Sequence, residues 1–110
     1  MNITTENFDN YTEIKLDGRL DTNTAPKLEK ALMALLDEGK EDLLINFTDL
    51  NYISSSGLRV LLVAAKSLDT KAKDKKLNFC SLQDFIKEVF DIAGFSVLFN
   101  FFNTPEEFKG

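Results

Sequence analysis

The chain contains no histidine and only one cysteine, Cys80, among its 110 residues. The absence of histidine excludes every Ser–His or Cys–His catalytic arrangement and the usual zinc sites. A single cysteine permits neither an intramolecular disulfide nor a cysteine-cluster metal site. Whatever the protein does, it does without these chemistries.

Positive charge and long hydrophobic runs are also scarce. The chain has 13 Lys and Arg against 18 Asp and Glu, a net charge of −5, which argues against a nucleic-acid partner because such binders usually carry concentrated basic surface. The first residues contain neither the basic nor the apolar segment of a signal peptide. No apolar run approaches the ~20 residues that a membrane-spanning helix needs. We expect one cytoplasmic domain over residues 1–110, with no membrane insertion.

Segments with the period of a strand alternate along the chain with segments that have the period of a helix. The polar opening residues are a candidate edge strand, and Asp17-Gly18 is expected to end the second strand as a turn. Strands are predicted at 11–17, 43–47, 77–80 and 97–101, and helices from 24 to 39, from about 58, from 81 to 94 and from 105. This alternation predicts an α/β fold.

Several side chains have predicted places in these elements. Ser81 is expected to cap the third helix, and Thr104 with Glu107 forms a capping box. Consecutive residues on a strand point to opposite faces, so we expect Phe101 and Phe102 to lie on different sides of the sheet. The buried stripe of the second helix is predicted to be Leu58, Leu61, Leu62, Ala65 and Leu68, and that of the third Leu82, Phe85, Ile86, Val89, Phe90 and Ala93.

Three consecutive serines, Ser54, Ser55 and Ser56, stand with Gly57 between a buried strand and the second helix. A serine at this place can cap the helix by accepting a hydrogen bond from its first turn. The same end of a helix favours an anion such as phosphate. A serine nucleophile is disfavoured, because the chain has no G-x-S-x-G elbow and no histidine to act as its base. From the residues alone, a cap and an anion site both remain open.

The stretch from Phe47 to Leu58, which holds these serines, resembles the signature of the STAS domain, in particular that of bacterial anti-sigma factor antagonists. The segment from Gly18 to Asp21 is similar to the G-x-L-D motif of that family. The segment from Phe90 to Phe95 is similar to the end of its penultimate helix. The resemblance covers nearly the whole chain. It implies a single STAS-like α/β domain whose mixed sheet of four to five strands carries helices mainly on one face.

The resemblance also implies which residues form the site. The family pattern is Asp-Ser-Ser/Thr-Gly-Leu, and its first hydroxyl residue is phosphorylated, which corresponds to Ser55. Ser56 and Ser54 are the alternative acceptors, and Ser54 departs from the pattern because it replaces the aspartate. The partner-binding residues implied by the resemblance are Asp21, Thr22, Ser54, Ser55, Ser56, Gly57 and Leu58. No catalytic residue, metal or cofactor is expected.

The function that the resemblance implies is partner switching in the regulation of transcription. The unphosphorylated protein would bind a serine-kinase anti-sigma factor, phosphorylation would release it, and a phosphatase would reset the phosphoserine. On this view the chain is a substrate and not an enzyme. An alternative is a STAS accessory subunit that regulates the ATPase of a transporter without a phosphorylation cycle. A third is a small-ligand or nucleotide domain that uses the turn from Ser54 to Gly57, although no Gly-rich phosphate loop is present.

Overall fold

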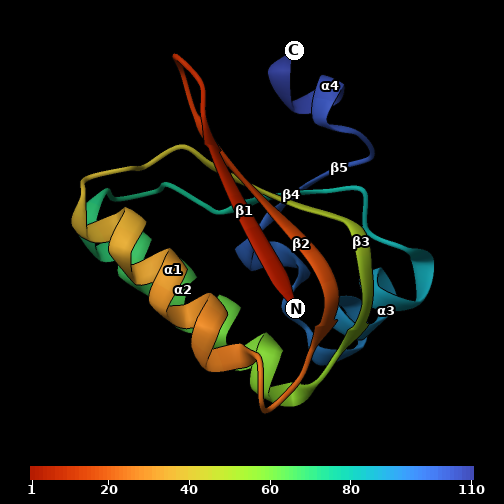
Figure 1. Cartoon of the computed structure of the whole chain (residues 1–110). Coiled ribbons are helices and arrows are strands. Elements are labelled where there is room, and N and C mark those ends of the chain that lie inside the picture. The colour runs from red at the N-terminus through yellow and green to blue at the C-terminus, as the bar shows by residue number, and fades with distance from the viewer.

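A five-stranded mixed sheet forms the centre of the computed structural model, which describes residues 1–110 (Figure 1). The strands follow one another across the sheet in chain order, with β1 antiparallel to β2 and every other neighbouring pair parallel. The strands are β1 (Asn2–Asn7), β2 (Thr12–Leu20), β3 (Leu43–Ile53), β4 (Asn78–Cys80) and β5 (Asn100–Phe102). The helices are α1 (Ala25–Asp37), α2 (Ser55–Lys71), α3 (Asp84–Ala93), the 3₁₀ helix η1 (Ser96–Leu98) and α4 (Pro105–Lys109).

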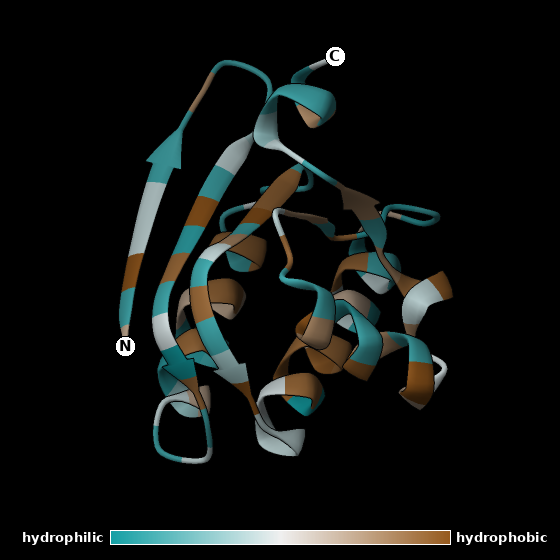
Figure 2. Ribbon diagram, turned by 90° about the vertical axis from the view of Figure 1, so that its right-hand side faces the viewer, coloured by the Kyte–Doolittle hydropathy of each residue, from teal (hydrophilic) through white to brown (hydrophobic).

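The longer helices cover one face of the sheet. In Figure 2, α1, α2 and α3 lie on the same side of the strands, whereas α4 lies at the end of the sheet near the C-terminus. The mixed sheet with helices mainly on one face is therefore confirmed. No helix combines the length and the apolar composition required to cross a bilayer.

Five phenylalanine rings form the aromatic part of the core between the sheet and its helices. Phe79 on β4 is at the centre of this cluster, and its ring centroid lies 4.4 Å from that of Phe99 and 4.9 Å from that of Phe47. Phe90 of α3 and Phe101 of β5 each lie 5.6 Å from the same ring. Because these contacts come from β3, β4, α3 and β5, the aromatic cluster joins the C-terminal half of the chain to the central strand.

The opposite face of the sheet is covered in part by α4. Phe102 packs against Phe108 of this helix at 5.4 Å between centroids, whereas Phe101 belongs to the main core. The prediction that the two consecutive rings point to different faces is confirmed. Glu13 alternates along β2 with the core residues Ile14 and Leu16, so its side chain lies on this opposite face. It is only 4% exposed, and its carboxylate accepts a hydrogen bond from Nδ2 of Asn46 at 3.0 Å.

The predicted end of β2 is wrong. Asp17-Gly18 does not terminate the strand, which continues to Leu20. Gly18 has a φ of +115°, a conformation that glycine adopts without strain. The pairing of β2 with β3 shifts register on both sides of Gly18, so that this residue belongs to an irregularity within the strand.

The buried stripes of the helices differ in part from the predicted ones. In α2, Leu61 and Leu68 are buried as expected. Val60 and Ala64 are buried as well, although they were not part of the predicted stripe. The predicted Leu58, Leu62 and Ala65 are partly buried against the core. In α3 only Ile86 and Phe90 are buried, and of the other predicted residues Leu82 and Val89 are partly buried while Phe85 and Ala93 are exposed.

The predicted ends of the later elements are corrected in two places and confirmed in a third. Ser81 does not cap α3, because this helix begins at Asp84. The backbone of Ser81 has a φ of +64°, and the Oγ of Ser81 donates to the carbonyl of Asn103. The predicted strand at 97–101 is divided between η1 and β5, because short apolar runs do not distinguish a strand from a helical turn. Thr104 caps α4, with Oγ1 accepting from the backbone N–H of Glu107 at 3.2 Å.

The aromatic core predicts a large difference between two phenylalanine substitutions. Phe79→Ala removes a fully buried ring and should lower the free energy of unfolding by about 3–5 kcal/mol, because the vacated space is only partly refilled. Phe85→Ala is the matched control, since this ring is 50% exposed and its loss should cost less than about 1 kcal/mol. Urea denaturation followed by circular dichroism measures both, and equal losses would contradict this description of the core.

Candidate functional site

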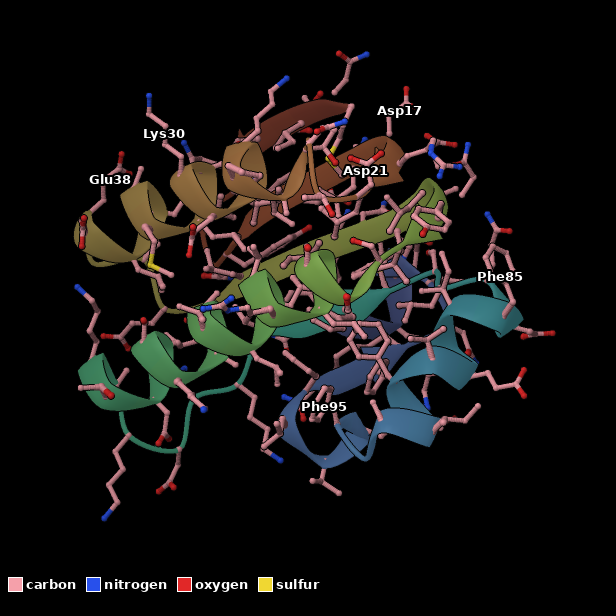
Figure 3. All side chains as sticks on the ribbon, turned by 90° about the horizontal axis from the view of Figure 1, so that it is seen from below. Asp17, Asp21, Lys30, Glu38, Phe85 and Phe95 are labelled. Atoms are coloured by element: carbon pink, nitrogen blue, oxygen red, sulfur yellow. The ribbon has the colours of Figure 1, made fainter.

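The site lies where β2 and β3 end at the same edge of the sheet. The two strands are parallel, and Leu20 and Ile53 are paired at their carboxyl ends. The backbone N–H of Ser54 donates to the carbonyl of Leu20 at 2.9 Å, so the hydrogen bonding continues one residue past β3. This bond joins the loop that follows β2 to the residue that precedes α2. Figure 3 shows Asp21 in this region, with α1 and α2 side by side.

Asp21 organises the loop between β2 and α1. Its Oδ1 accepts hydrogen bonds from the backbone N–H groups of Asn23 and Thr24 at 3.0 and 3.1 Å and from the hydroxyl of Thr24 at 3.2 Å. The hydrogen bond from the Thr24 N–H lowers the pKa of Asp21 most, against a smaller opposing effect of burial, and the bond from Asn23 and the nearby Arg19 add to the lowering. The carboxylate is therefore occupied by its own loop.

Ser54 caps α2, and the helix begins one residue later than this serine. The backbone of Ser54 is extended, and its Oγ accepts from the N–H of Gly57 at 3.3 Å. The predicted start of this helix near Leu58 is too late: the serine cap expected from the sequence is Ser54, and helix propensity does not reveal that the next two serines are already helical. Ser55 and Ser56 consequently occupy the first turn of α2.

The two serines of the first turn differ in what they contact. Ser56 is half-buried, and its hydroxyl lies 3.3 Å from that of Thr22 in the preceding loop. Ser55 is exposed, and no side-chain hydrogen bond engages its hydroxyl. Of the three serines, Ser55 is therefore the one whose hydroxyl is free to meet another protein.

At Gly57 the backbone of α2 packs closely against the side chain of Leu20 at the end of β2. A Cβ atom at this position would lie 2.5 Å from Cγ of Leu20 and 3.2 Å from Cγ1 of Ile53. Only a residue without a side chain fits this contact, so glycine is required for reasons of space. Gly57 is buried and Leu58 is partly buried against the core, so these two predicted partner-binding residues support the surface more than they form it.

A groove of about 370 Å³ runs from this site between α1 and α2. Thr22 and Ser56 lie at the site end of the groove, and Arg59 and Glu29 are its charged lining residues. The remaining lining residues are Ala25, Pro26, Val60 and Val63. Sequence reasoning missed the groove, since it exists only where two helices distant in the chain are packed together.

Two arginines near the serines were also missed. The guanidinium of Arg19 lies 4.0 Å from the centroid of the Tyr52 ring, and its Nε lies 3.8 Å from Oδ2 of Asp21. Arg59 stands on α2 one turn beyond Ser55 and takes part in none of the salt bridges. The helical spacing of Arg59 from the serine was readable from the sequence, but the absence of a salt bridge to Arg59 was not.

The site contains no arrangement suited to a metal ion. No group of three or more His, Cys, Asp or Glu side chains in the chain is close enough together to hold one. What the site presents is a free hydroxyl, a helix terminus and a groove lined by both polar and apolar residues, which are features suited to modification and to binding another protein.

Comparison with known proteins decides the family. The profile of the STAS domain matches residues 2–108. The chain belongs to the STAS domain family. Its relatives include BtrV of Bordetella bronchiseptica, a candidate anti-sigma factor antagonist, which is 35% identical over 106 residues that cover 96% of this chain and 90% of BtrV. The anti-sigma-B factor antagonist of Staphylococcus epidermidis is 34% identical over 94 residues, covering 86% of this chain and 85% of the relative.

Solved structures agree with the STAS assignment at the level of the fold. An anti-sigma factor antagonist from Mycobacterium paratuberculosis superposes with a TM-score of 0.86 at 21% identity, over 96% of this chain and 88% of that one. SpoIIAA in its unphosphorylated form gives a TM-score of 0.77 at 18% identity, over 98% and 94% of the two chains. The STAS fold expected from the sequence is confirmed.

The contact between Gly57 and Leu20 predicts a specific coupling in the STAS domain. Gly57→Ala forces a Cβ against Leu20 and should lower the free energy of unfolding by about 1–3 kcal/mol. In a Leu20→Ala background the same substitution should cost clearly less, because the opposing side chain is gone. Urea denaturation of the four proteins of this double-mutant cycle measures the coupling. Additive effects would show that the close approach is absent.

The hydrogen bonds to Asp21 predict a dependence of stability on pH. Because the folded-state pKa of Asp21 is lowered, its contribution is present above the ordinary carboxyl pKa of about 3.9 and is lost as the pH falls through the folded value. Asp21→Asn keeps an acceptor but no charge, so the stability difference between wild type and variant should be largest near pH 6. Chemical denaturation at pH values from 6 to 2.5 checks this, and a difference that stays constant over the range would contradict it.

Proposed function

We propose that this STAS protein is an anti-sigma factor antagonist that binds a serine-kinase anti-sigma factor and is released when the kinase phosphorylates Ser55. The observation that carries the proposal is the difference among the three serines. Ser54 is used as the cap of α2, Ser56 faces Thr22, and Ser55 alone presents a free, exposed hydroxyl. Ser54 or Ser56 could serve as the acceptor only after giving up these contacts.

Relatives support the class of partner. BtrV and the staphylococcal proteins are named as anti-sigma factor antagonists, and SpoIIAA has been solved in unphosphorylated and phosphorylated forms. This chain matches the phosphorylated form with a TM-score of 0.75, close to its match with the unphosphorylated form. These similarities favour a switch in which the fold persists and the surface changes.

The chemistry of the switch needs little from this chain. Oγ of Ser55 would attack the γ-phosphorus of ATP bound to the kinase, the bond to the bridging oxygen would break, and ADP would leave. The proton of the hydroxyl would pass to a base of the kinase. The protein is then the substrate, and the anti-sigma factor supplies the nucleotide and the catalytic groups. A phosphatase partner would return the hydroxyl by hydrolysis.

The added charge explains why the complex would dissociate. A phosphate carries about −1.5 to −2 charges at neutral pH, on a chain whose net charge is already −5. At the end of α2 the phosphate is tolerated within its own protein, because the first helical N–H groups favour an anion. In the interface, the phosphate would lose its hydration. It would also lie against partner groups that were in contact with the neutral hydroxyl of Ser55. A loss of about 3 kcal/mol weakens binding roughly a hundredfold.

Substitutions of Ser55 test the proposal with the cognate kinase. Ser55→Ala should bind the kinase as wild type does but should not be phosphorylated, and Ser55→Asp should bind about a hundredfold more weakly or worse. Isothermal titration measures the affinities, and mass spectrometry after incubation with ATP locates the phosphate.

Thr70→Asp provides the matched control for added charge. Thr70 is exposed near the other end of α2, roughly 22 Å along the helix axis from Ser55, and its substitution should leave the affinity within about threefold of wild type. Phosphate found on Ser54 or Ser56 would contradict the assignment of Ser55. Equal binding of wild type and Ser55→Asp to a transporter ATPase, without phosphorylation, would instead favour the accessory-subunit alternative.

A further inference from the structure

Arg59 is an exposed cation without an acidic partner close to the serines. It lies four residues after Ser55 on α2, so the two residues share a face of the helix. The four salt bridges of the protein involve Arg19, Lys71, Lys75 and Lys87, and none involves Arg59. An arginine whose fork of N–H groups is not engaged by a carboxylate is available to another anion.

The direction of side chains on a helix brings Arg59 toward Ser55. Residues four apart have Cβ atoms about 5–6 Å from each other. Side chains on an α-helix lean toward its N-terminus, so the long chain of Arg59 is able to extend back over the first turn, where Ser55 lies. A phosphate attached to Oγ of Ser55 would therefore be within reach of the guanidinium without any movement of the backbone.

Arg59 also belongs to the groove between α1 and α2. Its neighbours in the lining include Val60 and Val63 of the same helix and Glu29 of α1. Glu29 is the only acidic residue of this groove, and its carboxylate forms no salt bridge with Arg59. Arg59 therefore lines this groove and also shares a face of α2 with the site of modification.

We propose that Arg59 is a positioning residue that pairs with the phosphate on Ser55 and thereby withdraws from the groove between α1 and α2. The pair is a charge-assisted contact between a planar guanidinium and phosphate oxygens, which suits arginine better than lysine. Phosphorylation then changes two features of the surface together: it adds an anion at the end of α2 and removes a cation from the groove. The inference rests on the proposed function for the presence of phosphate on Ser55.

The pairing of Arg59 with the phosphate can be tested without a kinase, in a protein made with phosphoserine at position 55. Phosphoserine is incorporated at position 55 during synthesis of the full chain, and its second pKa is measured by ³¹P NMR titration. Pairing with Arg59 favours the dianion, so this pKa should be about 0.4 unit lower in the wild type than in Arg59→Ala. Arg59→Lys should fall between the two, because an ammonium supplies charge without the fork.

Lys66→Ala is the control for loss of a positive charge. Lys66 is exposed on the same helix, roughly 16 Å along the axis from Ser55, which exceeds the distance over which salt screens charges at physiological ionic strength. Its substitution should leave the second pKa of the phosphoserine unchanged. Equal values in Arg59→Ala and Lys66→Ala would overturn the pairing, and thermal denaturation confirms that both variants are folded.

Methyl resonances test the effect on the groove. Val60 and Val63 should shift as the phosphoserine titrates in the wild type, and these shifts should be lost in Arg59→Ala. Shifts of equal size in both proteins would refute the withdrawal of Arg59.

If the cognate kinase left Ser55 unmodified, the proposed function would fail while these titrations still decided the role of Arg59. If Ser55 were modified but the pKa did not depend on Arg59, only this inference would fail.

Discussion

The close approach of Leu20 to Gly57 determines how the two loops of the site lie relative to each other. Gly57 has no space for a Cβ, and the adjacent backbone bond from Ser54 to Leu20 holds the end of β2 against the start of α2. Because packed interiors tolerate little change of volume, this contact sets the distance between the loop of Asp21 and the serines. The meeting of Thr22 with Ser56 follows from it.

The site is built from a rigid frame and an accessible surface. Asp21, Ser54 and Gly57 form the frame. The side chains of Asp21 and Ser54 accept hydrogen bonds from backbone N–H groups, and Gly57 packs closely against a neighbouring side chain. Ser55 and Arg59 are exposed and remain without such contacts. A phosphate at Ser55 can therefore alter the electrostatics of the surface while the frame retains its hydrogen bonds. This separation suits a protein that is recognised in one charge state and rejected in another.

Aromatic packing supports this arrangement from the other end of the chain. The rings around Phe79 join β3 to β4, α3 and β5, so the C-terminal half is fixed to the strand that leads into Ser54. On the opposite face of the sheet, Glu13 and Asn46 are also buried and are joined by a hydrogen bond, although both are polar residues. A period of two identifies the sides of a strand but not what covers each side.

Local patterns in the sequence determined the alternation of strands and helices apart from η1, the end of α3 at Gly94 and the cluster of serines, because these depend on spacing and on residues near in the chain. They also carried the family resemblance. Tertiary structure alone decided which serine is free, since Ser56 is engaged by Thr22, 34 residues away. It likewise decided the groove beside Arg59 and the requirement for glycine at position 57. Both arise where elements distant in sequence come into contact, and the local sequence does not encode what those elements will meet.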